Sequence, residues 1–171
     1  PFFSIHDWFI SKTPCNSGIV PGTEQSTLSF AYNDIESVKQ LFAENPNKIA
    51  GLILEPVKND EPRDNFLAEL KDICEKEGAV LIFDEMIAGM RFDIRGAHHL
   101  WKVYPHLTTY GKCISNGFSF SALAGKREIM ELGGIQHDKR RAFLLSQTHG
   151  SETVGLAAAF ATLQECQRVK I

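Results

Sequence analysis

The feature that most constrains the fold of this chain is an apolar run over residues 79–83, which is followed at once by Asp84 and Glu85. An apolar run of this length, bounded by charge, is typical of a buried strand in a parallel sheet. A second, β-prone run over residues 108–110 is followed by a glycine and Lys112. The spacing leaves room for one crossover between parallel strands. Because ligands bind at the carboxyl ends of such strands, we expect Asp84 and Lys112 to face one pocket.

The rest of the chain alternates short apolar runs with amphipathic segments and turn residues. Strands are predicted over residues 27–30, 49–54 and 142–146. Helices are predicted after an N-cap at Asn33, over residues 64–78 up to a C-terminal glycine, within residues 96–104, and in an Ala-rich stretch that ends at Leu163. This alternation predicts an α/β fold with three layers, α/β/α, around a mostly parallel sheet.

The bulk composition excludes several classes of protein. The 171 residues are 43% hydrophobic and 23% charged, as in one ordinary globular domain. A net charge of −3 predicts no nucleic-acid or membrane partner, and no apolar run reaches the roughly 20 residues of a membrane helix. The four cysteines show no CxxC spacing, which favours reduced thiols in the cytoplasm. The histidines show no metal-ligand spacing, and we predict no metal site.

Residues 81–91, Leu-Ile-Phe-Asp-Glu-Met-Ile-Ala-Gly-Met-Arg, resemble the LIFDEV-x-x-G-F-R signature of class III aminotransferases. Residues 109–112 and 122–130 resemble the lysine segment of that family and the strand and turn that follow it. The glutamate-1-semialdehyde aminomutase-like branch is the most similar in pattern. The resemblance implies part of the large domain of a fold type I enzyme that uses pyridoxal 5'-phosphate (PLP).

The same resemblance assigns roles to three residues at the ends of the two central strands. It implies that Lys112 forms a Schiff base with PLP and is the catalytic residue. Asp84 would pair with the pyridine nitrogen, and Met86 would pack on one face of the ring. Each residue also has a simpler interpretation: Lys112 as an exposed lysine at a strand end, Asp84 as a helix cap, and Met86 as a core methionine.

Further cofactor contacts are implied at both ends of the chain and after an earlier strand. Phe2 aligns with the aromatic residue that stacks on the ring, and Thr148 with the threonine that reaches the phosphate of the neighbouring subunit. Glu55, in an E-P-V strand end, would border the pocket, and Asn59 is a candidate partner for the ring hydroxyl. The alternatives are a packed apolar terminus for Phe2, a helix cap for Thr148 and a solvated loop around Asn59.

The implied function is transfer of an amino group between a small-molecule amine donor and an aldehyde or ketone acceptor, in a homodimer with its active site at the interface. Residues 1–171 would be a partial large domain, without the N-terminal segment and the C-terminal small domain of the family. The alternative is a catalytically inactive fragment that keeps the fold and binds PLP weakly or not at all. A nucleotide-binding Rossmann module is disfavoured, because no G-x-G-x-x-G follows the first strand.

Overall fold

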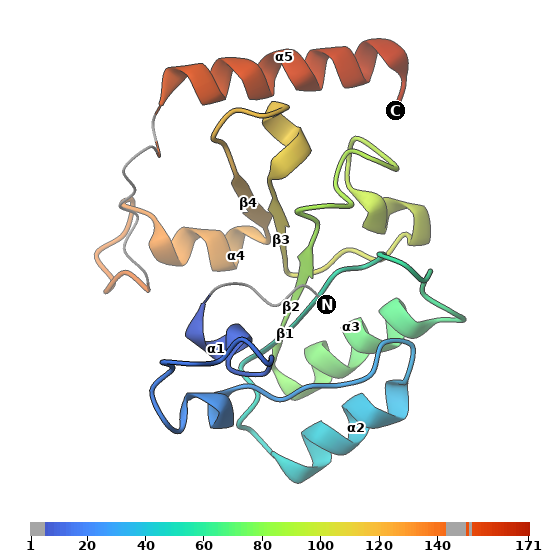
Figure 1. Ribbon diagram of the computed structural model, residues 1–171, viewed down its shortest axis with the longest axis vertical. Helices are drawn as coiled ribbons and strands as arrows, with labels where there is room; N and C mark the ends of the chain where they lie inside the picture. The colour runs from blue at the N-terminus through green and yellow to red at the C-terminus, as the bar shows by residue number, and fades with distance from the viewer. Residues whose placement is uncertain (1–5, 143–149, 151) are drawn as a thin grey trace.

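Four strands form one sheet at the centre of the computed structural model, which describes residues 6–142, 150 and 152–171 (Figure 1). The strands are β1 (Gly51–Leu54), β2 (Val80–Asp84), β3 (Leu107–Tyr110) and β4 (Ala122–Gly125), in the order β1-β2-β3-β4. The pairs β1–β2 and β2–β3 are parallel, and β3–β4 is antiparallel. The predicted mostly parallel sheet is therefore confirmed, and β1, β2 and β3 all end at the same edge.

Helices and single turns of helix connect and flank these strands. The α-helices are α1 (Asp7–Ile10), α2 (Ile35–Glu44), α3 (Phe66–Glu77), α4 (Arg127–Met130) and α5 (Thr153–Val169). The 3-10 helices are η1 (Thr23–Ser26), η2 (Ala97–Trp101), η3 (Lys112–Ser115) and η4 (Glu131–Gly133). In Figure 1, α2 and α3 lie together at one end of the molecule, and α5 lies at the opposite end. Among the described residues, no helix combines the length and apolar character that a membrane span requires.

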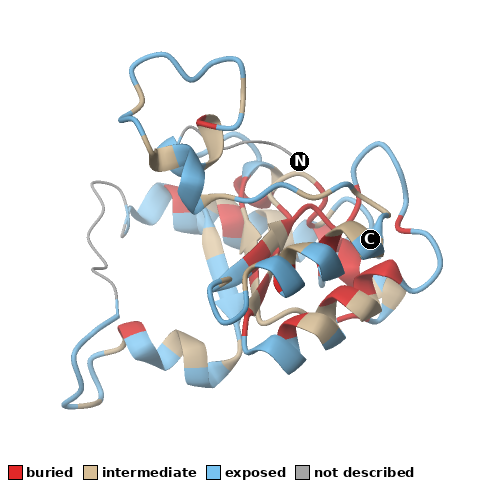
Figure 2. Ribbon diagram, turned by 90° about the horizontal axis from the view of Figure 1, so that it is seen from below, coloured by how far each residue is buried: buried red, intermediate tan, exposed pale blue. Residues whose placement is uncertain are grey.

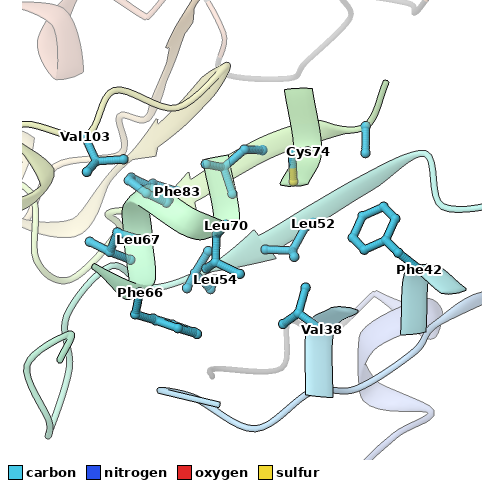
Figure 3. Close-up of a cluster of buried hydrophobic side chains, with 12 residues drawn as sticks. Val38, Phe42, Leu52, Leu54, Phe66, Leu67, Leu70, Cys74, Phe83 and Val103 are labelled. Atoms are coloured by element: carbon cyan, nitrogen blue, oxygen red, sulfur yellow. The ribbon is translucent and has the colours of Figure 1, made fainter. Parts of the chain in front are cut away.

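The main hydrophobic core lies between the sheet and the pair α2–α3. Side chains alternate across a strand, so that Leu81 and Phe83 of β2 both point to this side and are fully buried. They pack in one cluster with Leu70 of α3, which is also fully buried. Val38 of α2 belongs to the same cluster and lies on the side of β1 (Figure 3). Figure 2 shows the buried residues gathered where the helices meet the sheet, with exposed residues on the outer helix faces.

The opposite face of the sheet is covered, next to β1, by the N-terminal part of the described chain. Ile53 of β1 points away from the α2–α3 core and lines a cavity together with Phe9 of α1 and Phe30. Helices and loops thus lie on both faces of the sheet, and the predicted α/β fold with a layered arrangement is confirmed. The layer over β1 is thin, because α1 is only one turn long.

Two of the predicted helix ends can be compared with the structure. Helix α3 ends at Gly78, which has the left-handed φ of 69° that glycine adopts without strain, as predicted. The predicted N-cap at Asn33 is wrong by one residue, because the side chain of Asp34 accepts the Ser37 amide at 3.1 Å. Asn33 instead binds the loop before α3, where its side chain accepts the Arg63 amide at 2.9 Å. A tertiary contact therefore decides between two good capping residues.

The prediction of a strand over residues 27–30 is wrong, because this segment is irregular in the structure. A strand needs a hydrogen-bonded neighbour, and β1 pairs only with β2 along its length. Residues 27–30 and residues of β1 instead line a common cavity. The polar–apolar alternation of the sequence is not matched by alternating burial, since Leu28 and Ser29 are both exposed.

The remaining predictions concern the second half of the chain. The predicted strand over residues 142–146 lies outside the described residues except for Ala142, which forms no strand. The helix expected within residues 96–104 is the single 3-10 helix η2. Helix α5 runs to Val169, six residues beyond the predicted end, and packs on η3. Gly155 of α5 is buried against the segment after η3, where a Cβ would meet the carbonyl oxygen of Ser119.

Candidate active site

The carboxyl ends of β1, β2 and β3 bring three of the predicted site residues to one edge of the sheet. Glu55 follows β1 directly, Asp84 is the last residue of β2, and Lys112 follows β3 after one glycine. In the parallel register, Asp84 lies opposite Thr109, and Lys112 is the third residue after it. The acid and the lysine therefore stand at the ends of neighbouring paired strands, and their sharing of one pocket stays a prediction.

The carboxylate of Asp84 is fixed by two hydrogen bonds. Its Oδ1 accepts the hydroxyl of Thr109 at 3.1 Å and the backbone amide of Met86 at 3.1 Å. The bond to Met86 is the local turn that an aspartate makes with its own chain two residues on. The turn after β2 is not a helix, so the interpretation of Asp84 as a helix cap is not supported. The carboxylate is half-buried and lines the cavity over β1.

Lys112 stands at a sharp change of backbone direction. Gly111 is extended, with φ −170° and ψ −155°, and Lys112 adopts the left-handed φ of 48° before η3 begins. Left-handed geometry costs a residue with a Cβ roughly 1–2 kcal/mol, and it persists only where the surroundings impose it. The Lys112 side chain is exposed, whereas Ile114 and Ser115 behind it are buried and anchor the turn.

Met86 packs against the strand end that carries Lys112. A Cβ built on Gly111 would lie 2.7 Å from the Met86 sulfur, so the thioether occupies the space that any larger residue at position 111 would need. This contact explains the glycine before the lysine. It also places the Met86 side chain next to the end of β3; its predicted contact with a cofactor ring stays a prediction.

A cavity of about 300 Å³ lies over the carboxyl end of β1. Phe9, Phe30 and Ile53 are among its apolar lining residues, and Glu55 and Asp84 are among its acidic ones. Glu55 is buried and forms an ion pair with Lys58 at 3.3 Å. Asn59 also lines the cavity and is exposed. Lys112 is not among the residues that line this cavity.

The second carboxylate after β2 has a different surrounding from the first. Glu85 is completely buried and accepts the amides of Ala97 at 2.6 Å and His98 at 2.9 Å. Its Oε1 also lies 2.5 Å from Nδ1 of His98. Glu85 therefore anchors the start of η2 and is a structural residue. No group of metal ligands is present in the described part of the chain, and His98 is occupied by Glu85.

Sequence reasoning missed two residues that contact the site. Thr109 binds Asp84 directly, and the register of parallel strands would have found it. Tyr110, two residues before Lys112, packs on Gly89, and its hydroxyl donates to the carbonyl oxygen of Arg95 at 3.1 Å. Burial raises the pKa of Tyr110 to about 12, with a further contribution from the negative charge of Glu85, so the hydroxyl keeps its proton. Two predicted residues, Phe2 and Thr148, lie outside the described residues.

Comparison with known proteins gives one family for nearly the whole chain. A family model described as aminotransferase class III matches residues 10–171. A glutamate-1-semialdehyde 2,1-aminomutase from Acetivibrio thermocellus is 43% identical over 156 residues. This alignment covers 89% of the chain but 36% of that relative, so the chain spans about a third of the length of the curated relatives it matches.

Solved structures with the same fold are transaminases. An omega-transaminase from Sphaerobacter thermophilus superposes with a TM-score of 0.88 at 24% identity, over 96% of this chain and 42% of the other. A transaminase described with PLP bound superposes with a TM-score of 0.83 at 23% identity, over 96% of this chain and 41% of the other. These likenesses confirm the predicted fold, an α/β domain with a mostly parallel sheet.

Proposed function

Because this chain belongs to the class III aminotransferase family, we propose that it provides part of the cofactor-binding domain of a PLP-dependent aminotransferase or aminomutase. The reaction would transfer an amino group between an amine donor and an aldehyde or ketone acceptor. One observation carries this proposal: the acid that ends β2 and the lysine that follows β3 stand at the same edge of the sheet, on paired strands.

The described residues fit PLP by their chemistry. Asp84 presents a carboxylate that Thr109 already orients, and a carboxylate at this place suits the protonated nitrogen of a pyridine ring. Met86 offers a flexible apolar side chain beside it, of the kind that packs on a ring face. Lys112 supplies a primary amine on the neighbouring strand end. When bound, PLP supplies an electron sink for the carbanion formed when the substrate loses its α-proton.

Each side chain then has a distinct task. Asp84 would hold the proton on the ring nitrogen through a charge-assisted hydrogen bond, because the ring accepts electrons well only while that nitrogen is protonated. Lys112 would tether the cofactor through its amine and, once displaced by the substrate, would carry the α-proton as a general base. Glu55 would line the cofactor pocket beside Asp84, and the ion pair with Lys58 would hold the Glu55 carboxylate in place.

We further propose that the enzyme is a homodimer of the aminomutase branch and is located in the cytoplasm. Phe2 and Thr148 remain candidates for the ring face and for the cofactor phosphate of a neighbouring subunit, which would make the enzyme a homodimer with a shared active site. The name of the 43% identical relative supports the aminomutase branch. Cys15, Cys74, Cys113 and Cys166 are free thiols, which suits the reducing cytoplasm.

The alternative function is a fragment that keeps the fold but holds PLP weakly or not at all. Two observations favour it for the isolated chain. The Lys112 side chain is exposed and lies outside the cavity that Asp84 lines. The chain also spans about a third of the length of the curated relatives it matches.

A PLP titration of the purified chain separates the two functions. We expect a visible absorbance band that borohydride reduction fixes on one peptide, the one that contains Lys112. Lys112→Ala should abolish the band. Lys126→Ala is a matched control, because Lys126 also follows a glycine at a strand end, but after the antiparallel strand β4. A chain without the band, or a band that survives in Lys112→Ala, would refute the proposed role of Lys112.

A further inference from the structure

Tyr110, two residues before Lys112, and Cys113, directly after it, both contact Gly89, which lies in the turn after Asp84. On one side, the ring of Tyr110 lies directly over this glycine, since a Cβ at position 89 would lie 2.8 Å from Tyr110 Cδ1. On the other side, the thiol of Cys113 donates to the Gly89 carbonyl oxygen at 3.0 Å. Two independent contacts from the lysine segment thus converge on one residue.

Gly89 is in turn tied to the end of β2. Its amide donates to the carbonyl oxygen of Glu85 at 2.9 Å, and Glu85 is the fully buried residue next to Asp84. The far end of the Tyr110 ring is held as well, because its hydroxyl donates to the Arg95 carbonyl oxygen. A short, continuous chain of contacts therefore runs from the lysine segment to the strand end that carries Asp84.

These contacts explain why Lys112 keeps its strained backbone. A left-handed φ of 48° in a residue with a Cβ needs neighbours that fix the chain before and after it. Tyr110 fixes the chain before Lys112, and Cys113 fixes the chain after it. Gly89 must lack a side chain, since a Cβ there would displace the Tyr110 ring.

We propose that Tyr110 and Cys113 act as positioning residues, which clamp the Lys112 backbone onto Gly89 and so set where the lysine amine stands relative to Asp84. This inference rests on the proposed function for the role of Lys112. Its chemical basis is that a reacting amine must be held to a fraction of an ångström, and a misplacement of about 1 Å can cost a hundredfold in rate.

The test compares two pairs of matched variants. Tyr110→Leu and Cys113→Ala each remove one arm of the clamp. Tyr104→Leu and Cys15→Ala make the same chemical changes at exposed positions. Tyr110→Phe is a graded variant, because it keeps the ring over Gly89 and loses only the hydrogen bond from the hydroxyl.

Hydrogen exchange of the chain without cofactor reports the clamp directly. The amides of Ile114 and Asn116 are protected by bonds to the carbonyl oxygens of Gly111 and Cys113. Tyr110→Leu and Cys113→Ala should speed exchange over residues 112–116 about tenfold, equivalent to a local loss of about 1.4 kcal/mol, while β2 keeps its wild-type protection. If Tyr110→Leu loses protection throughout the chain, the smaller change Cys113→Ala decides the question.

PLP binding gives the second measurement. Both clamp variants should raise the Kd for PLP about tenfold and shift the pH midpoint of the absorbance band, whereas the two control variants should bind as wild type does. Wild-type exchange over residues 112–116 in both clamp variants, or wild-type PLP affinity in both, would overturn the inference. A wild-type chain that forms no band with PLP would instead refute the proposed function, and the exchange comparison alone would then decide whether the clamp exists.

Discussion

The hydrogen bond between His106 and Leu81 offers a sharp test of the fold at the start of the central strands. Nδ1 of His106 accepts the backbone amide of Leu81 at 2.9 Å, and the His106 amide donates to the Leu81 carbonyl oxygen at 2.9 Å. Pairing of β2 with β3 begins at Ile82, so the His106 ring supplies the acceptor that a backbone carbonyl of β3 would otherwise supply to Leu81. Leu81 is completely buried, so its amide has no access to bulk water if the ring is removed.

The expected magnitude follows from this geometry. His106→Leu keeps the size of the side chain but has no acceptor, and a buried donor left without a partner costs about 1–3 kcal/mol. In a domain of this length, each kcal/mol lowers the melting temperature by about 2–4 °C. His106→Asn is the matched control, because its Oδ1 can stand where Nδ1 stands and accept the same amide. We expect it to recover most of the lost stability.

The burial of the His106 ring makes stability depend on pH. Burial, aided by the positive charge of Lys126, holds the pKa of His106 below its ordinary value of 6.5. The folded state therefore binds fewer protons on this ring than the unfolded state does. The contribution of His106 to stability is complete above pH 6.5 and declines as the pH falls through the lower pKa of the folded state.

Urea unfolding between pH 8 and pH 5, followed by circular dichroism, measures these effects. The gap in unfolding free energy between wild type and His106→Leu should be largest above pH 6.5 and should shrink as the pH falls. Equal losses in His106→Leu and His106→Asn would refute the idea that the acceptor matters. A gap that is constant with pH would refute the linkage to the ring.

Three further predictions concern other parts of the chain. Gly155→Ala should destabilise the fold despite the better helix propensity of alanine, because the new Cβ would meet the Ser119 carbonyl oxygen; a raised melting temperature would contradict this close contact. Thr109→Val should weaken PLP binding about fivefold, since it removes the hydroxyl that orients Asp84, whereas Thr109→Ser should bind normally in the same titration. Asp34→Ala should cost about 1 kcal/mol in urea unfolding through loss of the α2 cap, and an equal loss in Asp34→Asn would show that charge rather than capping is responsible.

The sequence predicted those parts of the fold that depend on local periodicity. The stripe of apolar residues up to Gly78 defines α3, and the apolar run after it defines β2, because both patterns repeat over enough residues to be unambiguous. The pairing of β2 with β3 followed from the length of the connection between them. The sequence therefore predicts that Asp84 and Lys112 stand at one edge of the sheet.

The failures have a common physical cause, which is that the deciding contact lies far away in the chain. Residues 27–30 alternate as a strand does, but no neighbouring backbone is available to pair with them. Asn33 and Asp34 are both good capping residues, and the loop near Arg63 decides which of them caps α2. Similarly, the attachment of Tyr110 to Gly89 depends on the course of the turn after β2, which no local pattern encodes.

The two adjacent carboxylates show how strand geometry separates structure from chemistry. Successive side chains of a strand point to opposite faces, so Asp84 shares the face of Ile53 and the cavity, whereas Glu85 shares the face of the buried Phe83. Glu85 meets three nitrogen atoms of the first two residues of η2 and has no exposed surface left for a ligand. Asp84 uses one oxygen to accept two bonds from its neighbours, so its orientation is fixed while its face toward the cavity stays available for chemistry.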